Sequence, residues 1–326
     1  MAGRAPFDQP DIYQPRIDIT PETRLFTAGS CFAQHVTRYL KRAGMQVIDE
    51  EPAPDGLPDA VASKYGFGLY AARFGNIYTM RQFRQLLDEL SFDFEPSDII
   101  WERDGRFYDA LRPGVEPSGL EHPDHVREMR QAHLDATANA VSKADVVIFT
   151  MGLTESWEHI ESGTVYPTAP GTIAGAYDPD IYQFVNFGVL DILEDFNAAN
   201  EALRKINPDI KWILSVSPVP LTATATQDHV LSATMRSKSV LRAACDEICG
   251  LFDNVDYFPA YELVLNPASR GMNFADDLRN PTEETVANVM RVFFEAHQID
   301  LTVSQIEEPS EFNPHCEDVL LEAFQD

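Results

Sequence analysis

The segment DVVIFTMG, at residues 145–152, constrains the fold of this chain more than any other feature. Its side chains are almost continuously apolar, whereas a strand with one face in water alternates apolar and polar residues. The segment IKWILSVSP (210–218) has the same character, and RLFTAGS (24–30) is a shorter apolar run. This pattern predicts parallel strands that are buried on both faces.

Helical patterns alternate with these strands. In CFAQHVTRYLKRAG (31–44) the apolar residues share one face, and Gly44 suits the position just after a helix. Thr79 and Gln82 have the spacing of a capping box, so another helix should begin there. Further helices are predicted at about 122–143, 189–206, 235–252 and 286–294, further strands at 46–51 and 255–264, and a hairpin at 98–113. The alternation predicts an α/β fold with loop insertions, in which a parallel sheet has helices on both faces.

The chain has no internal repeat and no convincing linker, so we expect a single domain at residues 23–300. Residues 1–22 are polar and rich in proline, which is typical of an N-terminal arm. Residues 301–326 are acidic and are predicted to form a peripheral C-terminal tail.

Charge narrows the range of partners. The chain has 52 acidic and 25 basic residues, a formal net charge of −27, which should repel phosphate backbones and anionic lipid surfaces. We therefore expect no nucleic-acid or membrane partner. No signal peptide or membrane-length apolar run is visible, and the four cysteines show no zinc-type spacing with histidine. These features predict a reduced, cytoplasmic protein without a metal or organic cofactor.

Polar residues at the carboxyl ends of the strands are the candidates for a site, because parallel α/β sheets bind ligands at that edge. Ser30 follows the first strand and precedes a helix, whose free N–H groups and dipole favour developing negative charge. A serine there can attack a carbonyl carbon. The alternative is that Ser30 only caps the helix.

Several further segments extend the pattern around Ser30. Residues 29–33 spell GSCFA, and they are followed in order by FGNIYT (74–79), TMGLTESW (150–157), VYPTAPGT (165–172), SPVPLTATAT (217–226), SKSVLRAA (237–244) and YFPAYELV (257–264). This series resembles the GSCFA family over most of residues 22–296. That family is similar to SGNH (GDSL-like) hydrolases and acyltransferases. The resemblance implies a three-layer, flavodoxin-like sheet and a serine nucleophile after the first strand, here Ser30.

The resemblance also suggests groups that stabilise an oxyanion. The expected donors are the Ser30 N–H, a glycine N–H and a side-chain amide, and Gly75-Asn76 fits the second block of the SGNH pattern. The third block usually contains Gly-x-Asn-Asp, but here it is Gly152-Leu153-Thr154-Glu155. The third donor is therefore either the Asn76 amide or the Thr154 hydroxyl.

The general base is harder to place. SGNH enzymes carry Asp-x-x-His before the last helix, but this chain has Asp277-Leu278-Arg279-Asn280. His229, in the loop after 210–218, is the predicted base, and His159 is another possibility. The carboxylate that orients His229 is Glu155, Asp277 or Asp228, which the sequence does not rank. Two alternatives stay open: Cys31 as the nucleophile, and a Ser30–Lys238 dyad.

The predicted chemistry is ester hydrolysis or O-acyl transfer through an acyl-Ser30 intermediate. The substrate class is a small-molecule or saccharide ester. Trp157 is a candidate stacking wall for a sugar ring, and Glu262 a candidate for holding substrate hydroxyls. The alternatives are a binding protein that has lost its catalytic base, and a thiol function at Cys31.

Overall fold

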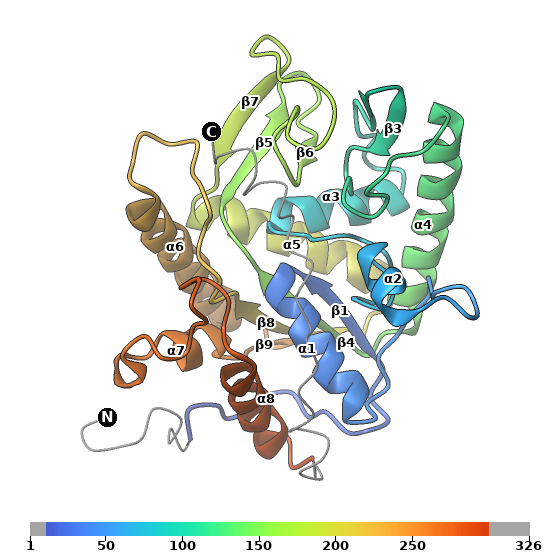
Figure 1. The fold of residues 1–326 in the computed structure, drawn as a ribbon. Helices are drawn as coiled ribbons and strands as arrows, with labels where there is room; N and C mark the ends of the chain where they lie inside the picture. The colour runs from blue at the N-terminus through green and yellow to red at the C-terminus, as the bar shows by residue number, and fades with distance from the viewer. Residues whose placement is uncertain (1–10, 300–326) are drawn as a thin grey trace.

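A computed structural model describes residues 11–299 of the chain. The predicted arm is described only from residue 11 onward, and the predicted acidic tail at 301–326 lies outside the described residues. The centre of the fold is a four-stranded parallel sheet in the order β1-β4-β8-β9 (Figure 1). Its strands are β1 (Leu25–Gly29), β4 (Val146–Met151), β8 (Lys211–Val216) and β9 (Val255–Tyr257). The predicted α/β class is confirmed.

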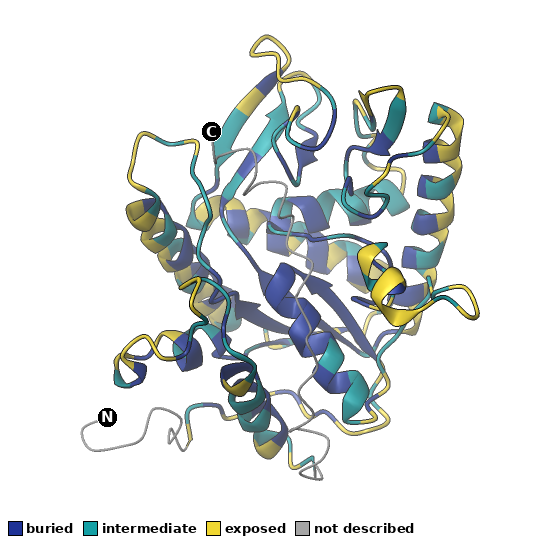
Figure 2. Cartoon of the chain, in the orientation of Figure 1, coloured by how far each residue is buried: buried dark blue, intermediate teal, exposed yellow. Residues whose placement is uncertain are grey.

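Side chains from the two faces of this sheet enter two separate cores. Phe26 and Phe149 pack on one side with α3 (Met80–Leu90), α5 (Val189–Ile206) and α6 (Val230–Leu251). Leu25 and Ile148 pack on the other side with α1 (Cys31–Arg42), α7 (Ala260–Leu265) and α8 (Glu283–Ala296). Figure 2 shows this sheet as mostly buried, and every residue of β1 and β4 is buried. The sheet therefore has helices on both faces, as the continuously apolar strands predicted.

Two of the predicted strands differ from the structure. In the predicted strand 46–51, only Val47 forms a single parallel bridge, to Leu25 of β1. The predicted strand 255–264 ends at Tyr257, and α7 begins at Ala260. Pro259 lies between them and has no N–H to donate to a ladder, so it ends the strand. Tyr261 and Glu262 therefore lie on a helix.

The remaining elements are insertions and covers. The predicted hairpin is confirmed, with Asp104-Gly105 in its turn. The segment after β4 forms a three-stranded antiparallel sheet in the order β6-β5-β7. The elements outside the central sheet and its two helical layers are α2 (Asp59–Lys64), β2 (Ile100–Arg103), β3 (Arg106–Asp109), α4 (Pro123–Lys143), β5 (Glu155–His159), β6 (Val165–Tyr166), β7 (Tyr182–Asn186) and a 3-10 turn, η1 (Pro267–Ser269). Within residues 11–299 no helix is long and apolar enough to cross a bilayer.

The predicted capping box at the start of α3 is confirmed. The Thr79 hydroxyl accepts the Gln82 N–H, and the Gln82 side chain accepts the Thr79 N–H at 3.0 Å. We expect Thr79→Ala to lower the free energy of unfolding by about 1 kcal/mol, because it removes one of these two caps. Urea unfolding of the two proteins measures the difference. Thr79→Ser, which keeps the hydroxyl, is the control and should recover most of the loss.

Candidate active site

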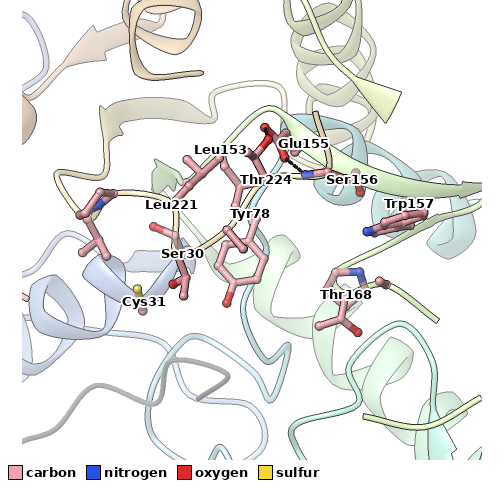
Figure 3. A pocket seen from close by; sticks show the side chains of 18 of the residues that line it. Ser30, Cys31, Tyr78, Leu153, Glu155, Ser156, Trp157, Thr168, Leu221 and Thr224 are labelled. Atoms are coloured by element: carbon pink, nitrogen blue, oxygen red, sulfur yellow. Dashed lines mark hydrogen bonds between the residues drawn. The ribbon is translucent and has the colours of Figure 1, made fainter. Parts of the chain in front are cut away.

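A cavity of about 260 Å³ lies at the carboxyl ends of β1, β4 and β8. Figure 3 shows Ser30 and Cys31 at one end, Tyr78 between, and Trp157 and Thr168 toward the other end. The loop that follows β8 supplies much of the apolar wall, including Val219 and Leu221. The cavity is therefore at the sheet edge where a ligand was expected.

Ser30 is the residue between β1 and α1, with extended backbone angles of φ −74° and ψ 176°. Its side chain does not cap the helix, so the simple capping interpretation of Ser30 is not what the structure shows. The Ser30 Oγ is buried and makes no hydrogen bond, although Ser30 lines the cavity. A buried hydroxyl without a partner is destabilising, so its retention in a cavity wall indicates a group kept for a ligand.

Two glycines allow β1 and β4 to approach at Ser30. Gly29 has φ +137°, and a Cβ built on it would lie 2.5 Å from the Thr150 carbonyl oxygen. A Cβ on Gly152 would lie 2.8 Å from the Ser30 Cβ. Any larger residue at either position would push Ser30 away from the sheet edge.

The predicted backbone donors are already engaged. The Ser30 N–H donates to the Thr150 carbonyl at 3.0 Å, and the Gly152 N–H donates to the Tyr78 carbonyl at 2.8 Å. Gly75 packs toward Arg112 and does not line the cavity. These three residues therefore do not form the predicted oxyanion site in this conformation. The N–H groups of Ser30 and Gly152 are bonded to backbone carbonyls, and Gly75 lies outside the cavity.

Asn76 is buried and supports the site indirectly. Its Oδ1 accepts from Gln34 Nε2 at 3.0 Å, and its Nδ2 donates to the Tyr78 hydroxyl at 3.2 Å. The Tyr70 hydroxyl lies 2.6 Å from Asn76 Oδ1 and 3.0 Å from the Ser30 carbonyl oxygen, and can donate to either. Asn76 does not line the cavity, but it holds Tyr78, which does.

Thr154 points away from Ser30. Its N–H donates to Ser237 Oγ at 3.0 Å, its hydroxyl donates to Asn186 Oδ1 at 2.7 Å, and Arg236 donates to the same hydroxyl. These bonds tie the end of β4 to α6 and β7. The alternative in which Thr154 supplies the third oxyanion donor is therefore not supported by its geometry.

Glu155 and Trp157, which are two positions apart on β5, both line the cavity. Glu155 Oε1 accepts from the Thr224 hydroxyl at 2.7 Å, and Oε2 accepts from the Ala225 N–H at 3.3 Å (Figure 3). The carboxylate contacts no histidine, so it does not have the orienting role predicted for it. It holds the loop after β8 over the cavity.

We expect Glu155→Gln to raise KM for ester substrates about 3–10-fold with little change in kcat, because the amide has one accepting oxygen in place of two and cannot accept from both Thr224 and Ala225, which loosens the loop. Steady-state kinetics measures the change. Glu158→Gln, on the same strand and bonded to Gln183, is the matched control and should leave KM unchanged. A kcat loss as large as that of a nucleophile variant would instead place Glu155 in the chemistry.

His229 was the predicted base, and the structure does not bring it to Ser30. It is exposed at the N-cap of α6, where its Nδ1 accepts the Leu231 N–H at 3.2 Å, and it does not line the cavity. The helix begins five residues before the predicted start, which makes His229 a cap. Asp228 beside it is exposed. His159 bonds Ser162, and no histidine among residues 11–299 lines the cavity.

Two other predicted ligand-binding residues lie in structural networks. The Glu262 carboxylate accepts from Arg242 Nε at 2.6 Å and from the Tyr257 hydroxyl at 2.8 Å, away from the cavity. Asp277 is exposed in a turn, where its Oδ1 accepts the N–H groups of Arg279 and Asn280, each at 2.9 Å. Asp277 therefore shapes the turn that places Arg279 in the cavity wall.

Lys238, which the sequence analysis gave only as an alternative to His229, is a buried titratable group close to Ser30. It is 1% exposed, and its Nζ donates to the Gly152 carbonyl at 2.5 Å, on the residue that packs against Ser30. Burial, with the Arg279 charge as a smaller contribution, lowers the pKa of Lys238 to about 7, against an opposing effect of Cys31. A lysine with this pKa is partly neutral at physiological pH and can accept a proton.

Cys31 is buried and also lines the cavity, so it stays the rival nucleophile. Residues 11–299 contain no group of three or more His, Cys, Asp or Glu that could hold a metal ion.

The model of the GSCFA family matches residues 24–293, which includes β1, the whole central sheet and most of α8. No curated protein matches the chain.

Proposed function

The chain belongs to the GSCFA family, and we propose that it is a serine-dependent esterase or O-acyltransferase that works through an acyl-Ser30 intermediate. The observation that carries the proposal is the Ser30 Oγ, which is buried without a hydrogen-bond partner in the wall of a 260 Å³ cavity. A nucleophile at a strand–helix junction has this environment.

In the proposed reaction, the Ser30 oxygen attacks the ester carbonyl carbon and the Lys238 amine takes the hydroxyl proton. The tetrahedral intermediate collapses, the C–O bond to the alcohol breaks, and the Lys238 ammonium returns the proton to the leaving oxygen. Water or an acceptor hydroxyl then attacks the acyl-enzyme by the same route in reverse. Lys238 Nζ donates to the carbonyl of Gly152, which packs against Ser30, and Lys238 does not itself line the cavity. The proposed proton transfer therefore requires the lysine to leave this carbonyl and reach the Ser30 hydroxyl.

Negative charge on the carbonyl oxygen needs donors other than those predicted, because the Ser30 and Gly152 N–H groups are engaged. In the first turn of α1 the Ser30 side chain caps no N–H group, and the Ala33 N–H donates to the Ser30 carbonyl at 2.8 Å. The α1 dipole favours negative charge at this end of the helix. We place the oxyanion there.

The finer fold proposal is a flavodoxin-like, SGNH-like sheet. Its support is the position of Val47, whose bridge to Leu25 lies on the side of β1 away from β4. That is the place a further parallel strand would take in a flavodoxin-like order. The proposed cytoplasmic location fits the free thiols of Cys31, Cys245 and Cys249, and the charge of −27 fits an absence of nucleic-acid and membrane partners.

A carbohydrate ester is a substrate class that the cavity would accommodate. Trp157 is held edge-on by Tyr177 and Phe184, with ring centroids 5.1 and 5.8 Å away. Trp157 and Phe184 both line the cavity. A fixed indole in a cavity wall is a suitable platform for a sugar ring.

The second candidate is a binding protein. It is favoured by Asn280, which stands where a histidine base is expected and whose Oδ1 is buried without a hydrogen-bond partner. An amide cannot accept a proton at neutral pH. In that case the cavity would hold a ligand without converting it.

Labelling with a fluorophosphonate probe separates these functions. The proposed enzyme should be labelled on Ser30, and the Cys31→Ala variant should be labelled equally well. Labelling that persists in Ser30→Ala but disappears in Cys31→Ala would move the chemistry to the thiol. A folded protein that takes no label would favour the binding function.

A further inference from the structure

Arg279 is a basic side chain in the cavity wall. Its Nε is buried and has no hydrogen-bond partner, and within residues 11–299 its guanidinium forms no ion pair. The rest of the lining is polar or apolar and uncharged except for Glu155, whose two oxygens bind Thr224 and Ala225. Arg279 is therefore the one basic side chain among the described residues that line the cavity, and it forms no ion pair with them.

The turn around Arg279 holds it in place. Asp277 Oδ1 accepts the backbone N–H groups of Arg279 and Asn280, and Asp277 Oδ2 accepts from Asn280 Nδ2 at 2.7 Å. Burial raises the pKa of Asp277, but these hydrogen bonds, with a smaller effect of the Arg279 charge, hold it below its ordinary value. The hydrogen bonds of the Asp277 carboxylate go to the backbone and to Asn280, so none joins it to the guanidinium in the cavity wall. Leu278, between them, has φ +55°, which bends the chain sharply at this point.

Acidic residues outnumber basic ones by 52 to 25 in this chain, so carboxylate partners for arginine are plentiful. Arg24, Arg38 and Arg130, for comparison, each bind a carboxylate. Burying the Nε of a guanidinium without a partner, as at Arg279, is unfavourable unless a ligand supplies the missing acceptor. The planar fork of arginine matches carboxylate and phosphate groups, which accept two parallel hydrogen bonds from it.

We propose that Arg279 binds an anionic oxygen group of the ligand, a carboxylate or a phosphate, while the ester lies at Ser30 in the same cavity. The inference deepens the proposed function by naming an acidic ester as the substrate class. Its binding step does not depend on the acyl chemistry.

Calorimetric titration of the Ser30→Ala protein tests this inference, because that variant cannot be acylated. The probes are phenylacetate, phenyl phosphate and the neutral phenylacetamide. We expect at least one anion to bind about 10-fold or more tightly than the amide, since a charge-assisted pair is being formed. The tighter of the two anions identifies carboxylate or phosphate as the preferred group.

Arg279→Gln, added to Ser30→Ala, should remove the difference between anion and amide, and Arg279→Lys should keep part of it. Arg291→Gln, which changes an exposed arginine paired with Glu295 on α8, is the control and should change nothing. Thermal melting shows whether each variant is folded. Equal binding of the amide, no binding of either anion, or an anion preference that survives in a folded Arg279→Gln protein would overturn the inference.

Because these titrations use a protein without the nucleophile, they succeed or fail independently of ester turnover. An anion site in a protein that never forms an acyl-enzyme would uphold this inference while the proposed function fails. Ester turnover without an anion preference would support the proposed function and overturn this inference.

Discussion

Ser30→Ala is expected to lower kcat/KM for 4-nitrophenyl acetate by about 10³-fold or more, since removing a catalytic nucleophile has effects of this size. The fold should tolerate the change well. The Ser30 Oγ makes no hydrogen bond, and the backbone contacts of Ser30 with Thr150 and Tyr70 do not involve its side chain. Spectrophotometric assay of 4-nitrophenol release measures the activity, and thermal melting confirms the fold.

Cys31→Ala is the matched control for this prediction, because it removes the neighbouring polar atom in the same cavity wall. It should keep turnover within a few-fold of wild type. Full activity in a folded Ser30→Ala protein, with loss in Cys31→Ala, would contradict the assignment of the nucleophile.

Lys238→Met is expected to lower kcat/KM about 10²–10⁴-fold, the usual contribution of a general base. In the wild type, Lys238 is protonated below its pKa of about 7 and cannot accept the Ser30 proton. The rate should therefore rise with pH through about 7 and level off above it, and the residual activity of Lys238→Met should lack this limb. Initial rates between pH 5.5 and 9 measure both profiles.

Lys238→Met should lower activity but raise the free energy of unfolding. Burial holds the pKa of Lys238 near 7 instead of its ordinary 10.5, so the unfolded chain binds the proton more tightly than the folded one. The lysine therefore destabilises the fold fully below pH 7, and this effect fades as pH rises toward 10.5. Relative to wild type, Lys238→Met should gain on the order of 2 kcal/mol more in unfolding free energy at pH 6 than at pH 9.

Urea unfolding at the two pH values measures this difference. Loss of both activity and stability in Lys238→Met, with no dependence on pH, would assign the lysine a structural role only. A pH limb near 7 that persists in the variant would show that another group is the base.

The parts of the fold that depend on local patterns were predictable from the sequence. The buried strands, the capping box at Thr79 and the hairpin at Asp104-Gly105 all rest on residues within a few positions of one another. The incorrect predictions arise where a neighbouring residue or element overrides the local pattern. The apolar segment 255–264 has strand composition, but Pro259 and the start of α7 end the ladder after three residues.

The site was predictable only in part, for the same reason. Ser30 was found because a strand and a helix meet at it. His229 was chosen because its loop follows β8, but the path of a loop is not encoded in its position along the chain. Lys238 could have been found from helical phase, since it lies three residues before Leu241 and seven before Cys245, both buried on α6. Lys238 was passed over because Arg236 and Arg242 lie near it on the predicted helix, and charged neighbours are typical of a solvated face.

The most direct test of the account is the intact mass of the protein quenched during turnover of 4-nitrophenyl acetate, followed by peptide mapping. The account predicts a single acetyl group on Ser30 in the wild type, none in Ser30→Ala, and slow accumulation in Lys238→Met. An acetyl group on Cys31, or no adduct on a folded protein that nonetheless releases 4-nitrophenol, would contradict the central role of Ser30.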